Sequence, residues 1–90
     1  QKSLEYARAT PDYIAFYAAL LQRQRRHDEA VEQFQAALRL RPQSGVWLLG
    51  MGVSLQALGR GAEAQEVYRR AKASGGLTPE LQAFVDQRLQ

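Results

Sequence analysis

The chain contains no cysteine and only one histidine, His27. Without thiols it forms no disulfide, has no thiolate nucleophile and cannot build a zinc finger of the cysteine type. A zinc site needs three or four protein ligands, which a single histidine without cysteine does not supply. We therefore expect neither a metal ion nor a cofactor in this chain.

Long apolar runs are absent as well. The longest, residues 13–21, is about half of the roughly 18 residues that span a bilayer. No basic segment followed by an apolar one opens the chain as a signal peptide would, and we expect no membrane contact by this segment. The first residue is Gln1 rather than Met, which indicates an excised fragment or a processed product.

Neither sign of charge dominates, because the net charge is only +3. Carboxylates such as Asp28 and Glu29 lie close to the basic clusters. A solvated helix surface therefore explains the charge pattern better than a nucleic-acid footprint. Weak binding of nucleic acid or another anionic polymer remains an alternative, through Arg23, Arg25, Arg26, Arg39, Arg41, Arg60, Arg69 and Arg70.

An internal repeat is the strongest positive signal. When the sequence is shifted by about 34 residues, many identical or similar residues coincide. The matched pairs are Leu21 with Leu55, Gln22 with Gln56, Arg26 with Arg60, Glu29 with Glu63, Ala30 with Ala64, Phe34 with Tyr68, and Ala37 with Ala71.

Each unit reads as two helices, because apolar residues recur at helical spacing on either side of a short turn. In the first unit Pro42 ends the second helix, and in the second unit Ser44 caps the first helix. Gly75 and Gly76 end its second helix. Thr78 as a cap and Pro79 at the first helical position then predict a final amphipathic helix.

Two terminal segments complete the predicted organisation. Leu4 and Tyr6 match Leu38 and Leu40 in the repeat register, so residues 1–10 are predicted to be the tail of a preceding second helix. Residues 11–44 and 45–78 form the two repeats, and residues 79–90 cover the apolar end of the array as a capping helix.

These residues resemble the tetratricopeptide repeat (TPR) family. Its pattern of large apolar, small, aromatic, alanine and proline positions is met by Ile14, Tyr17, Ala18, Leu21, Ala30, Phe34, Ala37 and Pro42, and in the second repeat by Leu48, Met51, Gly52, Leu55, Ala64, Tyr68 and Ala71. The resemblance implies an all-α, right-handed superhelical array of antiparallel helix pairs. It also implies a non-enzymatic scaffold for protein–protein interaction.

A narrower resemblance concerns residues 45–89. They are similar to the C-terminal TPR segment of bacterial pilus-biogenesis proteins of the mannose-sensitive haemagglutinin type, in a tryptophan followed by Gly-x-Gly, an "ALGR" turn and a closing "GGLTPEL" segment. This resemblance implies a role in pilus or secretion-machine assembly, in the bacterial cytoplasm, or in the periplasm if the parent protein carries a membrane anchor.

The glycines of residues 47–61 do not fit a phosphate-binding loop. Such a loop lies between a strand and a helix N-terminus, whereas Gly50 and Gly52 fall inside an apolar helix. Gly52 shares the small-residue position of Ala18 and is predicted to let two helices approach closely. Gly50 either admits a neighbouring side chain or leaves a gap for a ligand, and Gly59 and Gly61 are turn residues.

Catalytic constellations are likewise not indicated. His27 is interpreted as a solvated turn residue that helps to begin a helix. Glu29 and Glu32, like Glu63 and Glu66, recur with the repeat in the first turns of second helices, where negative charge suits the helix dipole.

The resemblance places a partner-binding surface on the first helix of each repeat. This concave face is predicted to comprise Asp12, Ala15, Ala19, Gln22, Arg23, Val46, Leu49, Gly50, Val53 and Gln56. An extended or helical peptide would lay apolar side chains on this face, with both glutamines bonding its backbone. The lysines and asparagines of the family's two-carboxylate clamp are missing, so we expect no binding of acidic chaperone tails.

Self-association is a further alternative. If repeats preceding the first one are missing, its N-terminal side exposes apolar surface that a second copy of the chain would cover.

Overall fold

The computed structural model describes residues 10–89, and in that range the chain forms five helices and no strand. They are α2 (Pro11–Arg23), α3 (His27–Leu40), α4 (Gly45–Ala57), α5 (Gly61–Ser74) and α6 (Pro79–Arg88). The all-α architecture is therefore confirmed. The predicted tail of a preceding helix lies outside the described residues, except for Thr10. None of the five helices is long and apolar enough to cross a bilayer.

The first helix of each unit and the closing helix begin in the same way. Thr10, Ser44 and Thr78 each use their side-chain oxygen to accept a backbone N–H bond from the first turn, at 3.3–3.4 Å. Pro11 and Pro79 lie at the start of α2 and α6, where the missing N–H group costs no helical bond. Both predicted caps, Ser44 and Thr78, are present.

The turns inside the two helix pairs also match. In each, the arginine before the second helix, Arg26 or Arg60, donates its backbone N–H to a leucine carbonyl of the first helix at 2.9 Å. The residue before that arginine has a positive φ, which is 64° for Arg25 and 78° for Gly59. A left-handed Gly75 ends α5. The two repeats therefore share the backbone conformation of their inner turns as well as their sequence pattern.

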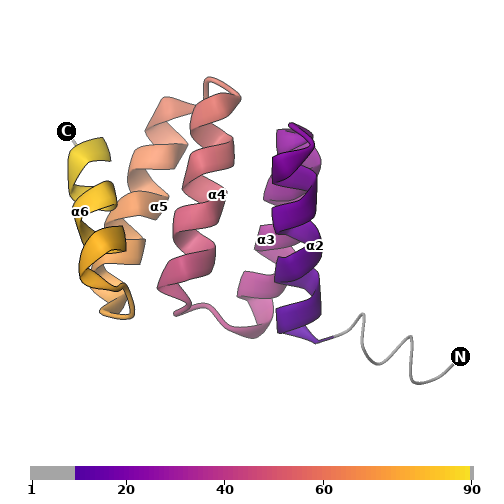
Figure 1. Ribbon diagram of the computed structural model, residues 1–90, viewed down its shortest axis with the longest axis horizontal. Coiled ribbons are helices and arrows are strands. Elements are labelled where there is room, and N and C mark those ends of the chain that lie inside the picture. The colour runs from indigo at the N-terminus through magenta and orange to yellow at the C-terminus, as the bar shows by residue number, and fades with distance from the viewer. Residues whose placement is uncertain (1–9, 90) are drawn as a thin grey trace, which may run out of the picture.

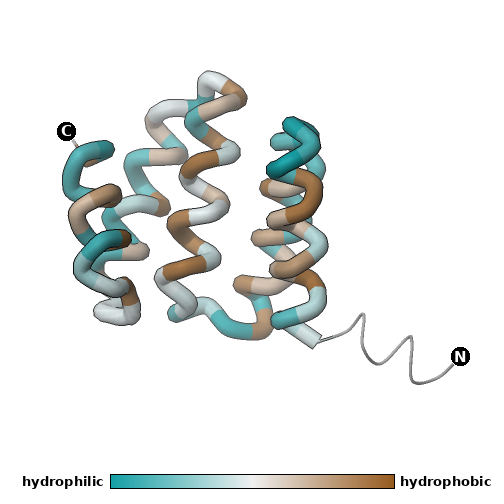
Figure 2. Tube along the Cα trace, in the orientation of Figure 1, coloured by the Kyte–Doolittle hydropathy of each residue, from teal (hydrophilic) through white to brown (hydrophobic). Residues whose placement is uncertain are grey.

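Consecutive helices pack against one another along the chain (Figure 1). Helix α4 lies in the middle and contacts α3, α5 and α2. Because it has neighbours on several sides, hydrophobic residues recur along the helix (Figure 2). The shared core consists of Ala18, Leu21, Ala30, Val31, Phe34, Leu38, Leu48, Met51, Leu55, Ala64, Val67, Tyr68, Ala71 and Val85. Val85 anchors α6 on this core, and the role of α6 as a cap of the array stays a prediction.

Two glycines of α4 are explained by the aromatic rings beside them. A Cβ on Gly52 would lie 2.7 Å from Cε1 of Tyr68, and one on Gly50 would lie 2.7 Å from Cζ of Phe34. Gly52 therefore serves helix packing, as predicted. Of the two expectations for Gly50, the structure shows the first, because a neighbouring ring fills the space. Gly59 lies in a turn as expected, whereas Gly61 is already the first residue of α5.

Candidate functional site

The residues predicted for the concave face differ in their accessibility. Asp12, Arg23, Val46 and Gln56 are exposed, Ala19, Gln22, Leu49, Gly50 and Val53 are partly buried, and Ala15 is buried. Among the predicted residues on α4, the apolar side chains that reach the solvent are those of Val46, Leu49 and Val53, which recur at helical spacing on one side of the helix. A hydrogen bond from the side chain of Gln22 to the backbone of Gly50 connects α2 to α4.

The amide of Gln22 links the two repeats. Its Nε2 donates to the backbone oxygen of Gly50 and to Oγ of Ser54, both at 2.8 Å. Since an amide nitrogen has two hydrogens, both are used inside the chain. We expected this side chain to bond to a partner's backbone, and only its carbonyl oxygen is left for that purpose.

Gln56, at the matching position of the second repeat, behaves differently. Its Oε1 accepts a hydrogen bond from the hydroxyl of Tyr68 at 2.9 Å, which is a contact within the repeat. The residue is exposed, and within residues 10–89 its amide nitrogen forms no hydrogen bond. The two glutamines therefore do not form an equivalent pair.

A buried polar group completes the junction between repeats. Ser54 is fully buried, and its Oγ lies 3.1 Å from Nδ1 of His27. Gln22 on α2 donates to the same oxygen at 2.8 Å. Ser54 thus has partners on both α2 and α3.

The expectation for His27 was correct in one respect and wrong in another. The residue begins α3 as predicted, but its ring is partly buried and contacts Ser54 instead of being a solvated turn residue. The signal in the sequence was a polar residue, Ser54, inside an otherwise apolar helix. It occupies the position that Leu20 has in the first repeat.

Asp12 at the start of α2 is held by the loop that leads into α4. Its Oδ1 accepts from Nη1 of Arg41 at 3.4 Å, and the guanidinium of Arg41 lies 5.6 Å from the ring centroid of Trp47. Both charges are well exposed, so their attraction contributes little to stability. The contact nevertheless directs the Asp12 carboxylate toward its own chain.

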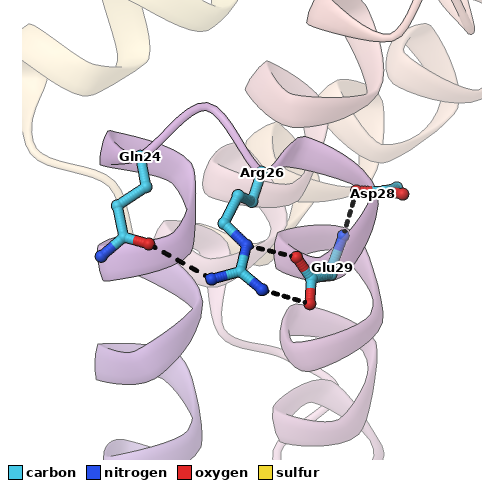
Figure 3. Close-up of polar contacts among 4 residues, drawn as sticks. All are labelled: Gln24, Arg26, Asp28 and Glu29. Carbon is cyan, nitrogen blue, oxygen red and sulfur yellow. Dashed lines mark hydrogen bonds and ion pairs between the residues drawn. The ribbon is translucent and has the colours of Figure 1, made fainter.

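The glutamates in the first turns of α3 and α5 pair with the arginine before the helix. Arg26 donates to both oxygens of Glu29, from Nε at 2.5 Å and from Nη2 at 2.9 Å (Figure 3). Arg60 does the same with Glu63 at 2.6 and 2.8 Å. The hydrogen bond from Arg60 lowers the pKa of the Glu63 carboxyl. These carboxylates therefore bind the arginine of the preceding turn, and they also lie at the positive ends of the helix dipoles.

The arginines named for nucleic-acid binding fall into two groups. Arg26, Arg41, Arg60 and Arg69 each pair with a carboxylate. Between residues 10 and 89, no ion pair involves Arg23, Arg25, Arg39 or Arg70. A paired guanidinium has less positive potential to offer a phosphate, so this arrangement weakens the nucleic-acid alternative.

A second candidate surface lies on α2, on the side where a preceding repeat would pack. We call it the N-terminal face and define it by Tyr13, Phe16, Tyr17 and Leu20, whose exposed fractions run from 37% to 62%. These residues form one stripe at helical spacing. Tyr13 and Tyr17, with Ile14 and Gln33, line a groove of about 390 Å³.

Comparison with known proteins agrees with the fold. The sequence model of one family, described as tetratricopeptide repeat, matches residues 21–87. No curated protein matches the chain. Because the family match spans most of the chain and the helices pack in consecutive pairs, the protein belongs to the tetratricopeptide repeat family, whose repeats generally mediate protein–protein interactions and are typically non-enzymatic.

Proposed function

We propose that this chain is a protein-interaction module that holds a peptide or a partner helix on the concave face. The observation that carries this proposal is the apolar stripe of α4. Val46 is 51% exposed, and Leu49 and Val53 follow it at helical spacing with partly exposed side chains. An apolar stripe on a helix surface is what an amphipathic or extended peptide covers when it binds.

Groups around the stripe define the chemistry of the partner. Ala19 on α2 is small, so it leaves room for a partner's side chain. Arg23 is exposed at the end of α2 and suits a carboxylate or a backbone carbonyl of the partner. Gln56 offers its amide nitrogen, whereas Gln22 offers only its carbonyl oxygen because both of its N–H groups are engaged.

A bacterial pilus or secretion machine is the setting that the resemblance of residues 45–89 suggests for this partner. The support is the sequence similarity alone. It is tested by the identity of the captured protein in the experiment below.

The proposal is tested by capture of the partner from an extract of the source cell with the purified chain, followed by mass spectrometry. We expect Leu49→Glu and Arg23→Glu to abolish or strongly reduce capture of a defined partner. Leu40→Glu is the matched control, because Leu40 is exposed at the end of α3, outside the concave face. Equal capture by Leu49→Glu and the parent chain, with the helical circular dichroism signal intact, would contradict the proposal.

The N-terminal face supports a second candidate function, association with another copy of the chain. Phe16 is 62% exposed and lies at the position that Phe84 has in α6, where the ring packs edge-on against Tyr68 with centroids 6.4 Å apart. No described residue gives Phe16 such an aromatic partner. An exposed apolar patch of this kind is typical of an interaction surface.

Sedimentation velocity over a range of chain concentrations tests self-association. We expect a dimer in the parent chain and a monomer in Phe16→Ser, while Val46→Ser, on the concave face, leaves the dimer unchanged. A monomer at every concentration would reject this candidate.

A further inference from the structure

A groove lies between the second helices of the two repeats, α3 and α5, over Met51 of α4. Its lining consists of Gln35, Leu38, Arg39, Pro42, Met51 and Arg70, and its volume is about 410 Å³. We call it the α3–α5 groove. Its floor is apolar, because Leu38 and Met51 belong to the core and are almost fully buried. The volume falls within the roughly 300–1,000 Å³ typical of ligand sites.

One arginine lies on each side of this floor. Arg39 comes from α3 and Arg70 from α5, and both are exposed. Neither forms an ion pair in the part of the chain that the structure describes. Glu66 lies four residues before Arg70, but its Oε1 bonds Nη2 of Arg69 at 3.0 Å. The groove therefore presents two positive charges that no carboxylate of its own helices neutralises.

The repeat does not account for these two arginines. In the repeat register, the position of Arg39 is occupied by Ala73 in the second repeat, and the position of Arg70 by Ala36 in the first. By contrast, Arg26 and Arg60 are repeat-equivalent and form the same ion pair in both turns. Arg39 and Arg70, which are not equivalent in the repeat, therefore line the same groove.

The helix dipole accounts for only one of them. Arg39 lies in the last turn of α3, where a cation is favourable in any case. Arg70 comes before the last turn of α5, which already has Lys72. The charge on the α5 side of the groove therefore has no structural reason within the described chain.

We propose that the α3–α5 groove binds an acidic peptide segment, with carboxylates on Arg39 and Arg70 and an apolar side chain on Leu38 and Met51. A guanidinium binds a carboxylate through two parallel hydrogen bonds. The apolar floor between the two arginines favours a peptide with an apolar side chain over a purely polar anion. Gln35 adds an amide for the peptide backbone. This site is separate from the concave face, so the chain holds two partners or two segments of one partner.

Fluorescence anisotropy with a short labelled peptide, in which glutamate alternates with leucine, tests the proposal. We expect Arg39→Glu and Arg70→Glu each to weaken binding by roughly five- to tenfold. Each substitution removes one partly exposed ion pair with the peptide and places a repelling charge in its stead. The double variant should show no measurable binding of this peptide and should gain binding of the matching lysine–leucine peptide. Arg25→Glu carries the same charge change in a distant turn and should have little effect.

Two further probes separate the acidic peptide from other ligands. Replacing leucine by serine in the peptide should weaken binding, because the apolar floor then has no partner. Single-stranded oligothymidylate of equal charge should bind more weakly than the peptide. The proposal is overturned if Arg39→Glu and Arg70→Glu leave peptide binding unchanged, if Arg25→Glu weakens it equally, or if the oligonucleotide binds as tightly. Leu49→Glu tests the concave face independently and should not alter this binding.

Discussion

Gly52 lies so close to Tyr68 that a Cβ on the glycine would stand 2.7 Å from the tyrosine ring. The ring is held in place, since its hydroxyl donates to Gln56 and it packs against the Phe84 ring in a T-shaped arrangement. We expect Gly52→Ala to lower the free energy of unfolding by about 1–2 kcal/mol, because overpacking outweighs the gain in helix propensity of about 1 kcal/mol. Urea unfolding followed by circular dichroism measures this change.

The control for this prediction is Gly61→Ala. Gly61 begins α5, and nothing lies within 4 Å of a Cβ placed there. This substitution should leave stability unchanged or raise it by a few tenths of a kcal/mol. An unfolding midpoint for Gly52→Ala at or above that of the parent chain would show that Tyr68 moves aside freely.

The turn between α2 and α3 carries a backbone conformation that its residue disfavours. Arg25 has a φ of 64°, whereas Gly59 occupies the same place in the second repeat with a φ of 78°. Arg25→Gly should raise the free energy of unfolding by about 0.5–1 kcal/mol, because left-handed backbone costs a side-chain-bearing residue roughly 1–2 kcal/mol and glycine's looser unfolded state offsets part of that.

The reciprocal substitution is the check. Gly59→Ala should destabilise the chain by about 1 kcal/mol, since it introduces the same strain into the second repeat. Thermal unfolding of both variants measures the two effects with opposite signs. If both substitutions shift the midpoint in the same direction, the backbone conformation is not what determines their stability.

Much of this fold was predictable from the sequence. The pairing of apolar positions at a constant spacing predicted α2 to α5, and Thr78 and Pro79 predicted the start of α6. The match of Gly52 with Ala18 identified a packing glycine from the sequence alone. Positions facing a neighbouring helix are constrained by the repeat, so they recur and can be recognised. The turn equivalence of Arg26 and Arg60 follows from the same constraint.

The junction between the repeats was not predictable in the same way. Ser54 is far along the chain from both Gln22 and His27, so these side chains meet only when α4 packs against α2 and α3. Sequence periodicity indicates which face of a helix is buried, but not which polar atoms meet there. The roles of Gln22 and His27 therefore needed three-dimensional contacts.

This junction gives a prediction for the coupling between repeats. Gln22→Ala leaves the fully buried Ser54 without its amide donor, and we expect a loss of about 1–3 kcal/mol in the free energy of unfolding. In Ser54→Ala the buried hydroxyl itself is removed. A double-mutant cycle should therefore show that the combined loss is smaller than the sum of the single losses. Additive losses would mean that the two side chains stabilise the chain independently.

The attachment of α6 should depend on pH through Asp86. Its carboxyl accepts from Nζ of Lys72 on α5 at 3.0 Å, and this hydrogen bond lowers the pKa of Asp86. A lowered pKa in the folded state means that the contribution to stability is present at neutral pH. It is lost as the pH falls below about 4, toward the lowered value.

Asp86→Asn isolates this contribution. We expect the variant to unfold at lower urea concentration than the parent chain at pH 7, and the difference between them to shrink toward zero in acid, because the parent then loses the same charge. Glu80→Gln is the comparison variant: it removes a carboxylate that forms no ion pair within residues 10–89 and acts only through the dipole at the start of the same helix. Its effect should therefore be smaller than that of Asp86→Asn. Urea midpoints measured across this pH range test the sign. A difference between parent and Asp86→Asn that stays constant or grows in acid would show that the Lys72 contact does not secure α6.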